Sequence, residues 1–114
     1  MTNTIITPAE VESRNDVFVL DVRPAYSFEE EHIVGSHNLP IYDQLKGKNF
    51  IGLDASTAEL PKDEEIAVVC FSGSTAGIAA ERLRDQGFDA KRLVGGIAGW
   101  EAGTAGTVQA AQSV

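Results

Sequence analysis

The feature that most constrains this 114-residue chain is an apolar run that ends in its only cysteine and leads through small residues into a helical pattern. Ile66-Ala67-Val68-Val69 is typical of a buried strand, and Cys70 closes it. The residues that predict the helix share the spacing of one helix face, and they are Ala76, Ala79, Ala80 and Leu83. A strand that turns directly into a helix is the repeating unit of parallel α/β proteins.

The loop between this strand and helix predicts a site for an anionic sulfur atom. After Cys70 it consists of Phe71, Ser72, Gly73, Ser74, Thr75 and Ala76. Such a loop points backbone N–H groups inward, and the following helix adds about half a positive charge at its start. A sulfur held there is favoured as thiolate, the form that attacks and can carry a second sulfur. We therefore interpret Cys70 as a nucleophile and the six following residues as substrate-binding residues. An inert, buried core cysteine is the opposing interpretation, and the polar loop argues against it.

Composition and charge narrow the class of protein. The length supports one domain with a real core, and no apolar run approaches the roughly 20 residues of a membrane helix. The first residues lack the basic and apolar regions of a signal peptide, which predicts a cytoplasmic protein without membrane association. The net charge of −8 argues against nucleic-acid binding, which needs clustered Lys and Arg.

A single cysteine limits the chemistry further. It cannot form an internal disulfide or a two-cysteine redox pair, so another molecule must resolve any adduct on Cys70. His32 and His37 have no spacing to Cys70 that suggests a metal site, and we predict neither a metal nor a cofactor.

Strand and helix patterns alternate along the whole chain. Strands are predicted at 5–6, 17–22, 38–41, 66–70 and 92–94, and helices after Thr7, at 24–31, after Cys70 and at 97–101. Residues 42–60 predict one or two short helices broken by Gly47 and Gly52. The domain is expected to span residues 1–102, with a flexible tail at 103–114. The strands should form a parallel sheet with helices on both faces, and ligand sites in such sheets lie outside the carboxyl ends of strands, where Cys70 falls.

Three local signals refine this prediction. Thr7 and Glu10 predict a capping box at the first helix. Gly87 should end the long helix in a left-handed conformation, with Phe88 packing back on Leu83. The pair Gly95-Gly96 indicates a turn with positive φ or a close backbone approach near the cysteine loop.

Several segments, in order and at consistent spacing, resemble single-domain rhodaneses. They are Leu20-Asp21-Val22-Arg23, residues 32–40 (His-Ile-Val-Gly-Ser-His-Asn-Leu-Pro), the loop that begins at Cys70 with its alanine-rich helix, Gly87-Phe88, and residues 93–100 (Leu-Val-Gly-Gly-Ile-Ala-Gly-Trp). The resemblance covers residues 4 to 102. It implies a five-stranded parallel sheet and a sulfurtransferase whose cysteine cycles through a persulfide.

The resemblance also assigns supporting roles. Asp21 and Arg23 match the family's Asp-x-Arg segment, and as an acid and a guanidinium at one strand end they should pair and fix the neighbouring loop. His32 matches the family's Gly-His-Ile segment, and we interpret it as a packing and hydrogen-bonding residue. The expected partners are a small sulfur-donor molecule or a persulfide-carrying protein, with a thiol, cyanide or protein as acceptor. The sequence does not predict the oligomeric state.

The chain departs from the family in the charge of its loop. Many rhodaneses place arginine in this loop to bind thiosulfate, whereas Phe71 and Thr75 fill those positions here. Arg82 and Arg84 follow on the helix and are expected to be too far along it. We therefore predict weak thiosulfate turnover and a preference for thiol or protein persulfides, which an apolar rim at Phe71 would suit.

Two other functions are considered. Cysteine phosphatases and arsenate reductases end a similar loop with an arginine that clamps the oxyanion, and Ala76 at that position disfavours them. A non-catalytic binding module on the same fold, with Cys70 merely retained, stays open.

Overall fold

The computed structural model describes residues 3–103 and 108–110 and contains a main sheet of five parallel strands. The strands lie in the order β1-β6-β5-β2-β4, which places β5 at the centre of the sheet. Their bounds are β1 Ile5–Ile6, β2 Val17–Asp21, β4 His37–Asn38, β5 Glu65–Val69 and β6 Asp89–Leu93. The predicted five-stranded parallel α/β fold is confirmed.

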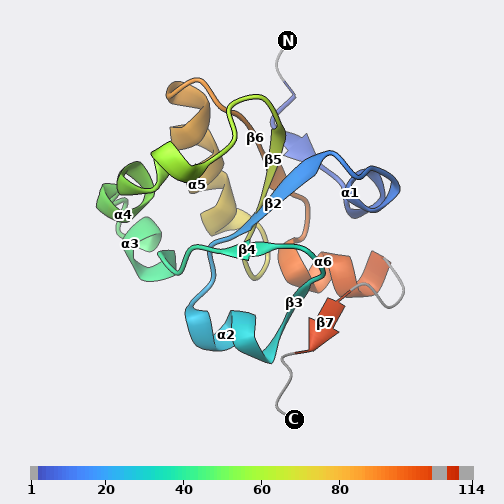
Figure 1. Cartoon of the computed structure of the whole chain (residues 1–114). Coiled ribbons are helices and arrows are strands. Elements are labelled where there is room, and N and C mark those ends of the chain that lie inside the picture. The colour runs from blue at the N-terminus through green and yellow to red at the C-terminus, as the bar shows by residue number, and fades with distance from the viewer. Residues whose placement is uncertain (1–2, 104–107, 111–114) are drawn as a thin grey trace.

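Helices cover both faces of this sheet. In Figure 1, α3, α4 and α5 lie on one side of the central strands, and α1 and α6 lie on the other. The helix bounds are α1 Pro8–Ser13, α2 Ala25–Glu30, α3 Tyr42–Lys46, α4 Ile51–Ala55, α5 Ser74–Asp85 and α6 Gly96–Gly103, with a 3₁₀ turn at Thr57–Glu59. Within the described part of the chain, no helix combines the length and apolar character needed to cross a membrane.

The alternation of side chains along β5 decides where the cysteine sulfur points. Ile66 and Val68 face the helix side built by α3, α4 and α5, and they share one core cluster with the buried alanines of α5. Ala67 and Val69 face the opposite side and share the second cluster with α1 and α6. Because side chains alternate with a period of two, Cys70 follows Ile66 and Val68 onto the α5 side, and it belongs to their cluster. The sulfur therefore lies beneath the start of α5.

Two predicted helix caps are present. At α1, Thr7 Oγ1 accepts from the backbone N–H of Glu10 at 3.1 Å, and the Glu10 carboxylate accepts from the Thr7 N–H at 2.9 Å. At the end of α5, Gly87 has a φ of +93°, and the N–H of Phe88 donates to Leu83 O at 3.0 Å. These bonds form a capping box and a Schellman motif, so both predictions are confirmed.

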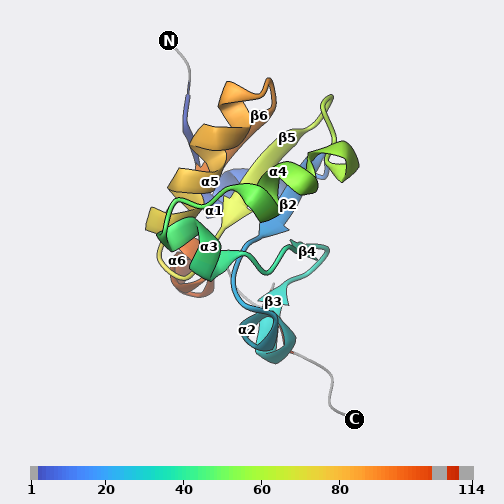
Figure 2. The same cartoon turned by 90° about the vertical axis from the view of Figure 1, so that its left-hand side faces the viewer.

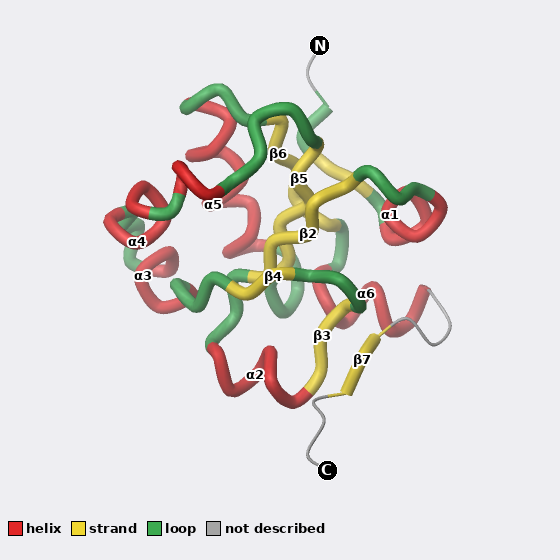
Figure 3. Tube along the Cα trace, in the orientation of Figure 1, coloured by secondary structure: helices red, strands yellow, loops and turns green. Residues whose placement is uncertain are grey.

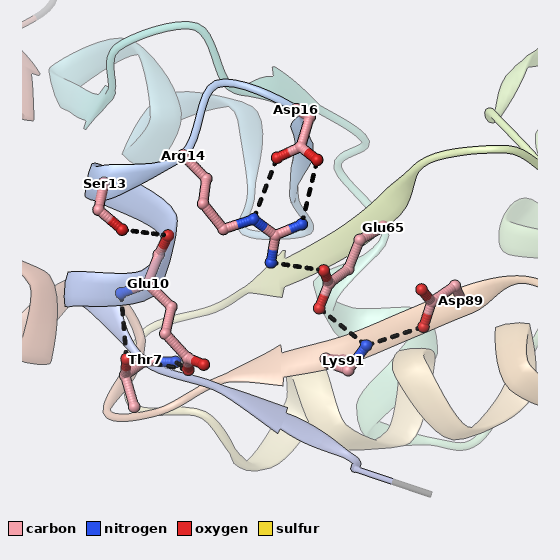
Figure 4. A network of polar contacts seen from close by, with 8 residues as sticks. All are labelled: Thr7, Glu10, Ser13, Arg14, Asp16, Glu65, Asp89 and Lys91. Carbon is pink, nitrogen blue, oxygen red and sulfur yellow. Dashed lines mark hydrogen bonds and ion pairs between the residues drawn. The ribbon is translucent and has the colours of Figure 1, made fainter.

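An ion-pair network closes the amino end of the sheet, opposite to the cysteine (Figure 4). Arg14 bonds to Asp16 at 3.0 Å and to Glu65 at 2.7 Å, and Lys91 bonds to Glu65 at 2.7 Å and to Asp89 at 2.8 Å. The hydrogen bond from Arg14 lowers the pKa of the Asp16 carboxyl. Burial opposes the charge on Lys91, but its hydrogen bonds to Asp89 and Glu65 raise its pKa overall. Arg14 and Lys91, two of the nine lysines and arginines of the chain, are therefore paired with carboxylates at this end of the sheet.

The segment 42–60 contains the expected short helices, but Gly52 does not break one. Gly52 lies inside α4, where its N–H donates to Gln44 Oε1 at 3.0 Å. A methyl group at Gly52 would approach Gln44 Oε1 to 2.6 Å and Ile41 Cγ2 to 2.8 Å. The glycine thus allows α3 and α4 to pack closely, which local sequence does not reveal.

A second, two-stranded sheet lies apart from the main one, as Figure 3 shows, and Figure 2 shows its labelled strand β3 beside α2, away from the central strands. It pairs β3, Glu31–Ile33, antiparallel to β7, Val108–Ala110. The sequence predicted a flexible tail at 103–114, whereas Gly103 ends α6 and residues 108–110 form β7. Pairing at a strand edge uses backbone groups alone, so no side-chain periodicity signals it. The tail prediction for 104–107 and 111–114 lies outside the described residues.

Candidate active site

The sulfur of Cys70 is held by backbone N–H groups of the loop that follows β5. Gly73 and Ala76 donate to Sγ at 3.1 and 3.2 Å. The Ala76 amide belongs to the first turn of α5, so the sulfur lies at the positive end of that helix. Only 1% of Cys70 is exposed. This arrangement stabilises a negative charge on sulfur without any side-chain base.

Glycine at position 73 makes this arrangement possible. Gly73 is the N-cap of α5 and has a φ of +118°, a conformation that residues with a side chain rarely adopt. The reversal turns the chain around the sulfur. Ser72 and Ser74 are exposed on either side of Gly73, whereas Thr75 is buried at 6% exposure. Of the predicted loop hydroxyls, those of the two serines are thus open to solvent.

A second helix holds the back of the same loop. At the start of α6, the N–H of Ile97 donates to Cys70 O at 2.9 Å and the N–H of Ala98 donates to Phe71 O at 3.3 Å. Gly96 touches these carbonyls, because a methyl group there would lie 2.6 Å from Cys70 O and Phe71 O. Gly95 and Gly96 have φ values of +77° and +61°. The predicted positive φ and close approach are therefore both confirmed.

Replacing Gly96 with alanine should damage the loop more than positive φ alone explains. The added methyl group meets backbone atoms of Cys70 and Phe71, which cannot rotate away. We expect a loss of about 3 kcal/mol in the free energy of unfolding, from backbone strain and displacement of the loop. Gly35→Ala is the matched control, because Gly35 has a φ of +85° with open space around it. Equal losses in urea unfolding of the two variants would show that the contact at Gly96 contributes nothing.

Asp21 and Arg23 form a buried ion pair at the end of β2. The Arg23 Nη2 and Nε atoms donate to Asp21 at 2.8 and 3.0 Å, and Nη2 also donates to Glu31 O at 2.7 Å. Asp21 is fully buried and Arg23 is 3% exposed. Asn38 Nδ2 donates to the carbonyl oxygens of both residues at 3.0 Å. The predicted pairing is present, and the guanidinium lies 5.8 Å from the centre of the Phe71 ring.

Aromatic side chains form the rim beside the loop. Phe71 is 36% exposed, and Tyr42 from α3 meets its ring edge-to-face at 5.0 Å. Lys46 lies 5.5 Å from the Tyr42 ring. The rim is thus apolar at Phe71, as predicted. Arg23 lies against the Phe71 ring and Lys46 against the Tyr42 ring. The sequence analysis did not identify Tyr42, because nothing in the residues of α3 indicates that this side chain contacts Phe71 in the loop after β5.

The arginines on α5 are held away from the sulfur. Arg82 bonds to Asp54 of α4 at 2.6 Å, and its hydrogen bonds lower the pKa of that carboxyl. Arg84 Nη1 donates to Ala90 O at 3.0 Å. His32 stacks on Phe28 with ring centres 3.9 Å apart, and its Nδ1 lies 2.7 Å from Phe28 O. The contacts of His32 agree with a structural function. Because Arg82 and Arg84 are bonded elsewhere, the loop receives no positive charge from the side chains of α5.

Sequence reasoning missed Arg92 of β6. The side chain of Arg92 lies against the loop at Gly73, where a methyl group would be 3.0 Å from Arg92 Nη1. The register of the sheet pairs Val68 with Arg92, which brings this strand alongside the one that leads to Cys70. Only the position of β6 beside β5 in the sheet would have indicated that Arg92 lies near the cysteine loop.

The fold and the site together define a parallel α/β domain whose cysteine thiol is held by backbone amides between the central strand and a helix. The chain belongs to the rhodanese family, because the family described as Rhodanese-like domain matches residues 7–103.

Curated relatives include sulfurtransferases of different sizes. The maize (Zea mays) protein "Adenylyltransferase and sulfurtransferase MOCS3-2" is 35% identical over 83 residues, which are 72% of this chain and 17% of the maize protein. "Thiosulfate sulfurtransferase GlpE" of Coxiella burnetii (strain RSA 493) is 29% identical, over 82% of this chain and 79% of that protein. "Putative sulfur carrier protein YrkF" of Bacillus subtilis is 30% identical, over 79% and 43%. The chain thus spans a small part of the maize relative's length.

Solved structures share the fold. A rhodanese-related protein from Thermoplasma volcanium has a TM-score of 0.72 at 29% identity, covering 89% of this chain and 94% of that one. The rhodanese-like domain of the Anabaena Alr3790 protein has a TM-score of 0.76 at 25% identity, covering 96% of this chain and 80% of that one.

Proposed function

We propose that the protein is a sulfurtransferase that carries a sulfane sulfur as a persulfide on Cys70. The observation that carries this proposal is the pair of N–H groups, from Gly73 and Ala76, that donate to the cysteine sulfur at the start of α5. The same groups favour the thiolate before transfer and the anionic persulfide after it. We propose that the loop residues Phe71 to Ala76 bind the sulfur donor and that the Asp21–Arg23 pair supports the loop from β2.

The proposed cycle has two displacement steps. Cys70 thiolate attacks the outer sulfur of a donor, so a new S–S bond forms while the donor's own S–S bond breaks. The donor leaves with the electron pair, as sulfite from thiosulfate or as a thiolate from a persulfide. An acceptor thiolate or cyanide then attacks the terminal sulfur of the Cys70 persulfide, and Cys70 returns to thiolate. No external oxidant or reductant is needed, and the kinetics should be ping-pong.

The rim favours an organic or protein donor over free thiosulfate. Phe71 and Tyr42 present apolar surface, and Arg82 and Arg84 are engaged elsewhere. The relative named "Putative sulfur carrier protein YrkF" agrees with a protein donor, whereas the relative named "Thiosulfate sulfurtransferase GlpE" agrees with some use of thiosulfate. We propose a thiol persulfide or a persulfide-carrying protein as the donor, in the cytoplasm, with thiosulfate used weakly.

One observation favours a second function, a non-catalytic binding module. Cys70 is only 1% exposed, so a donor must enter the loop to reach the sulfur. If the loop does not admit a donor, the thiol is inert and the domain can only bind a partner.

Intact-mass measurement separates the two functions. After incubation with thiosulfate or with glutathione persulfide, a sulfurtransferase should gain the mass of one sulfur atom, and cyanide should remove it. Glutathione persulfide should label more completely than thiosulfate. Because the chain has one cysteine, protein first alkylated at Cys70 is the matched control and should gain nothing. A chain that gains no sulfur from either donor would contradict the proposed sulfurtransferase and agree with a binding module.

A further inference from the structure

The side chain of Arg92 runs along the outer wall of the cysteine loop. A methyl group at Gly77, in the first turn of α5, would lie 3.1 Å from Arg92 Cδ, and one at Gly73 would lie 3.0 Å from its Nη1. The two glycines therefore leave a path for the arginine, which ends with its guanidinium against Gly73. The amide of Gly73 is one of the two that donate to Cys70 Sγ. The guanidinium therefore lies against one of the two residues that hold the sulfur.

Arg92 differs from the other arginines in having no partner for its guanidinium among the described residues. Each of the other four donates a side-chain hydrogen bond, and these are Arg14, Arg23, Arg82 and Arg84. The chain carries a net charge of −8, so acidic partners are plentiful. Arg92 is half-buried as a residue. A guanidinium without an internal partner retains its donors for an anion, and its planar fork suits oxyanions.

We propose that Arg92 is a specificity-determining residue that selects sulfur donors with an anionic group, such as a sulfonate or carboxylate, next to the transferred sulfur. This inference rests on the proposed function. The loop contains no cation of its own, and Arg23 beneath Phe71 is paired with Asp21. Arg92 therefore supplies, at the Gly73 wall, a positive charge that is unpaired among the residues the structure describes. It would attract the anionic donor and stabilise the group that departs with the electron pair, while the amides hold the sulfur.

The sequence predicted weak thiosulfate turnover from the missing charge in the loop. That expectation counted charge only within the loop and its helix, whereas the neighbouring strand supplies a cation from outside. Thiosulfate use should accordingly be weak but dependent on Arg92.

The test compares Arg92→Gln and Arg92→Lys with Lys48→Gln, which removes the same charge from an exposed residue. Cys70 is alkylated with anionic iodoacetate and with neutral iodoacetamide, and the ratio of the two rates reports the electrostatic attraction at the thiol. Arg92→Gln should lower this ratio about fivefold and raise the KM for thiosulfate about tenfold. Arg92→Lys should recover most of both effects, Lys48→Gln should change neither, and thermal unfolding checks that each variant folds.

Each outcome bears on a different claim. The inference would be overturned if Arg92→Gln left the ratio of the iodoacetate and iodoacetamide rates unchanged, even where both rates fell equally. If the wild-type protein transfers no sulfur but Arg92→Gln still lowers the ratio of alkylation rates about fivefold, the proposed function is overturned and the anion selectivity stands. A thiol that neither reagent modifies would overturn the inference, because no anion could then reach the loop.

Discussion

Replacing Cys70 with serine should lower sulfur transfer to cyanide by about a thousandfold or more, and the fold should survive. A hydroxyl is a poor nucleophile at neutral pH and forms no persulfide. Its oxygen can still accept from the N–H groups of Gly73 and Ala76, which hold the sulfur in the wild type. The free energy of unfolding should therefore change by about 1 kcal/mol or less.

Cys70→Ala is the matched variant for this experiment. It should be equally inactive but less stable than the serine variant, because both amides then lose their acceptor in a buried site. Transfer kinetics and urea unfolding, measured on the same preparations, separate the chemical from the structural contribution of the side chain. Activity retained by Cys70→Ser would show that sulfur does not travel through this residue.

The local part of the site could be predicted from the sequence because each signal lies within a few residues. The alternation of Ile66, Val68 and Cys70 determines which face of the sheet the thiol joins. The small residues after it make the turn into α5, and Gly73 adopts the positive φ that such a turn needs. The helix caps at Thr7 and Gly87 follow from the same kind of short-range chemistry.

The remainder depends on contacts between distant segments. The sequence predicted a helix at 97–101 and a close approach at Gly95-Gly96, but not the two bonds by which the N–H groups of Ile97 and Ala98 hold the loop from behind. Arg92 lies beside Gly73 because β6 pairs with β5, and strand order cannot be read from single segments. The pairing of β3 with β7 uses backbone groups and so carries no signature in the side chains.

Charge near the loop illustrates the same limit. The sequence gives the number of cations but not which of them are already paired. Arg23 lies under Phe71, yet its charge is largely compensated by Asp21, so it orders the site more than it attracts anions. Arg92 has no such partner among the described residues. Folding thus determines which arginine is available to a ligand.

Removing the guanidinium of Arg23 should destabilise the protein severely. Arg23→Met leaves the fully buried Asp21 carboxylate without its ion-pair partner, and it also removes the bond to Glu31 O. We expect the free energy of unfolding to fall by about 3–5 kcal/mol in urea titrations. Sulfur transfer should fall as well, because Phe71 loses the cation beneath its ring.

Two further variants test the cause of that loss. In Asp21→Asn/Arg23→Met, no charge is left buried, so the double variant should lose less stability than the sum of the two single changes. Arg82→Met removes a guanidinium from a half-exposed pair with Asp54, and solvent screening should limit its effect to a small loss. If Arg23→Met proved no more harmful than Arg82→Met, burial of the Asp21–Arg23 pair would not be what holds the end of β2 beneath the cysteine loop.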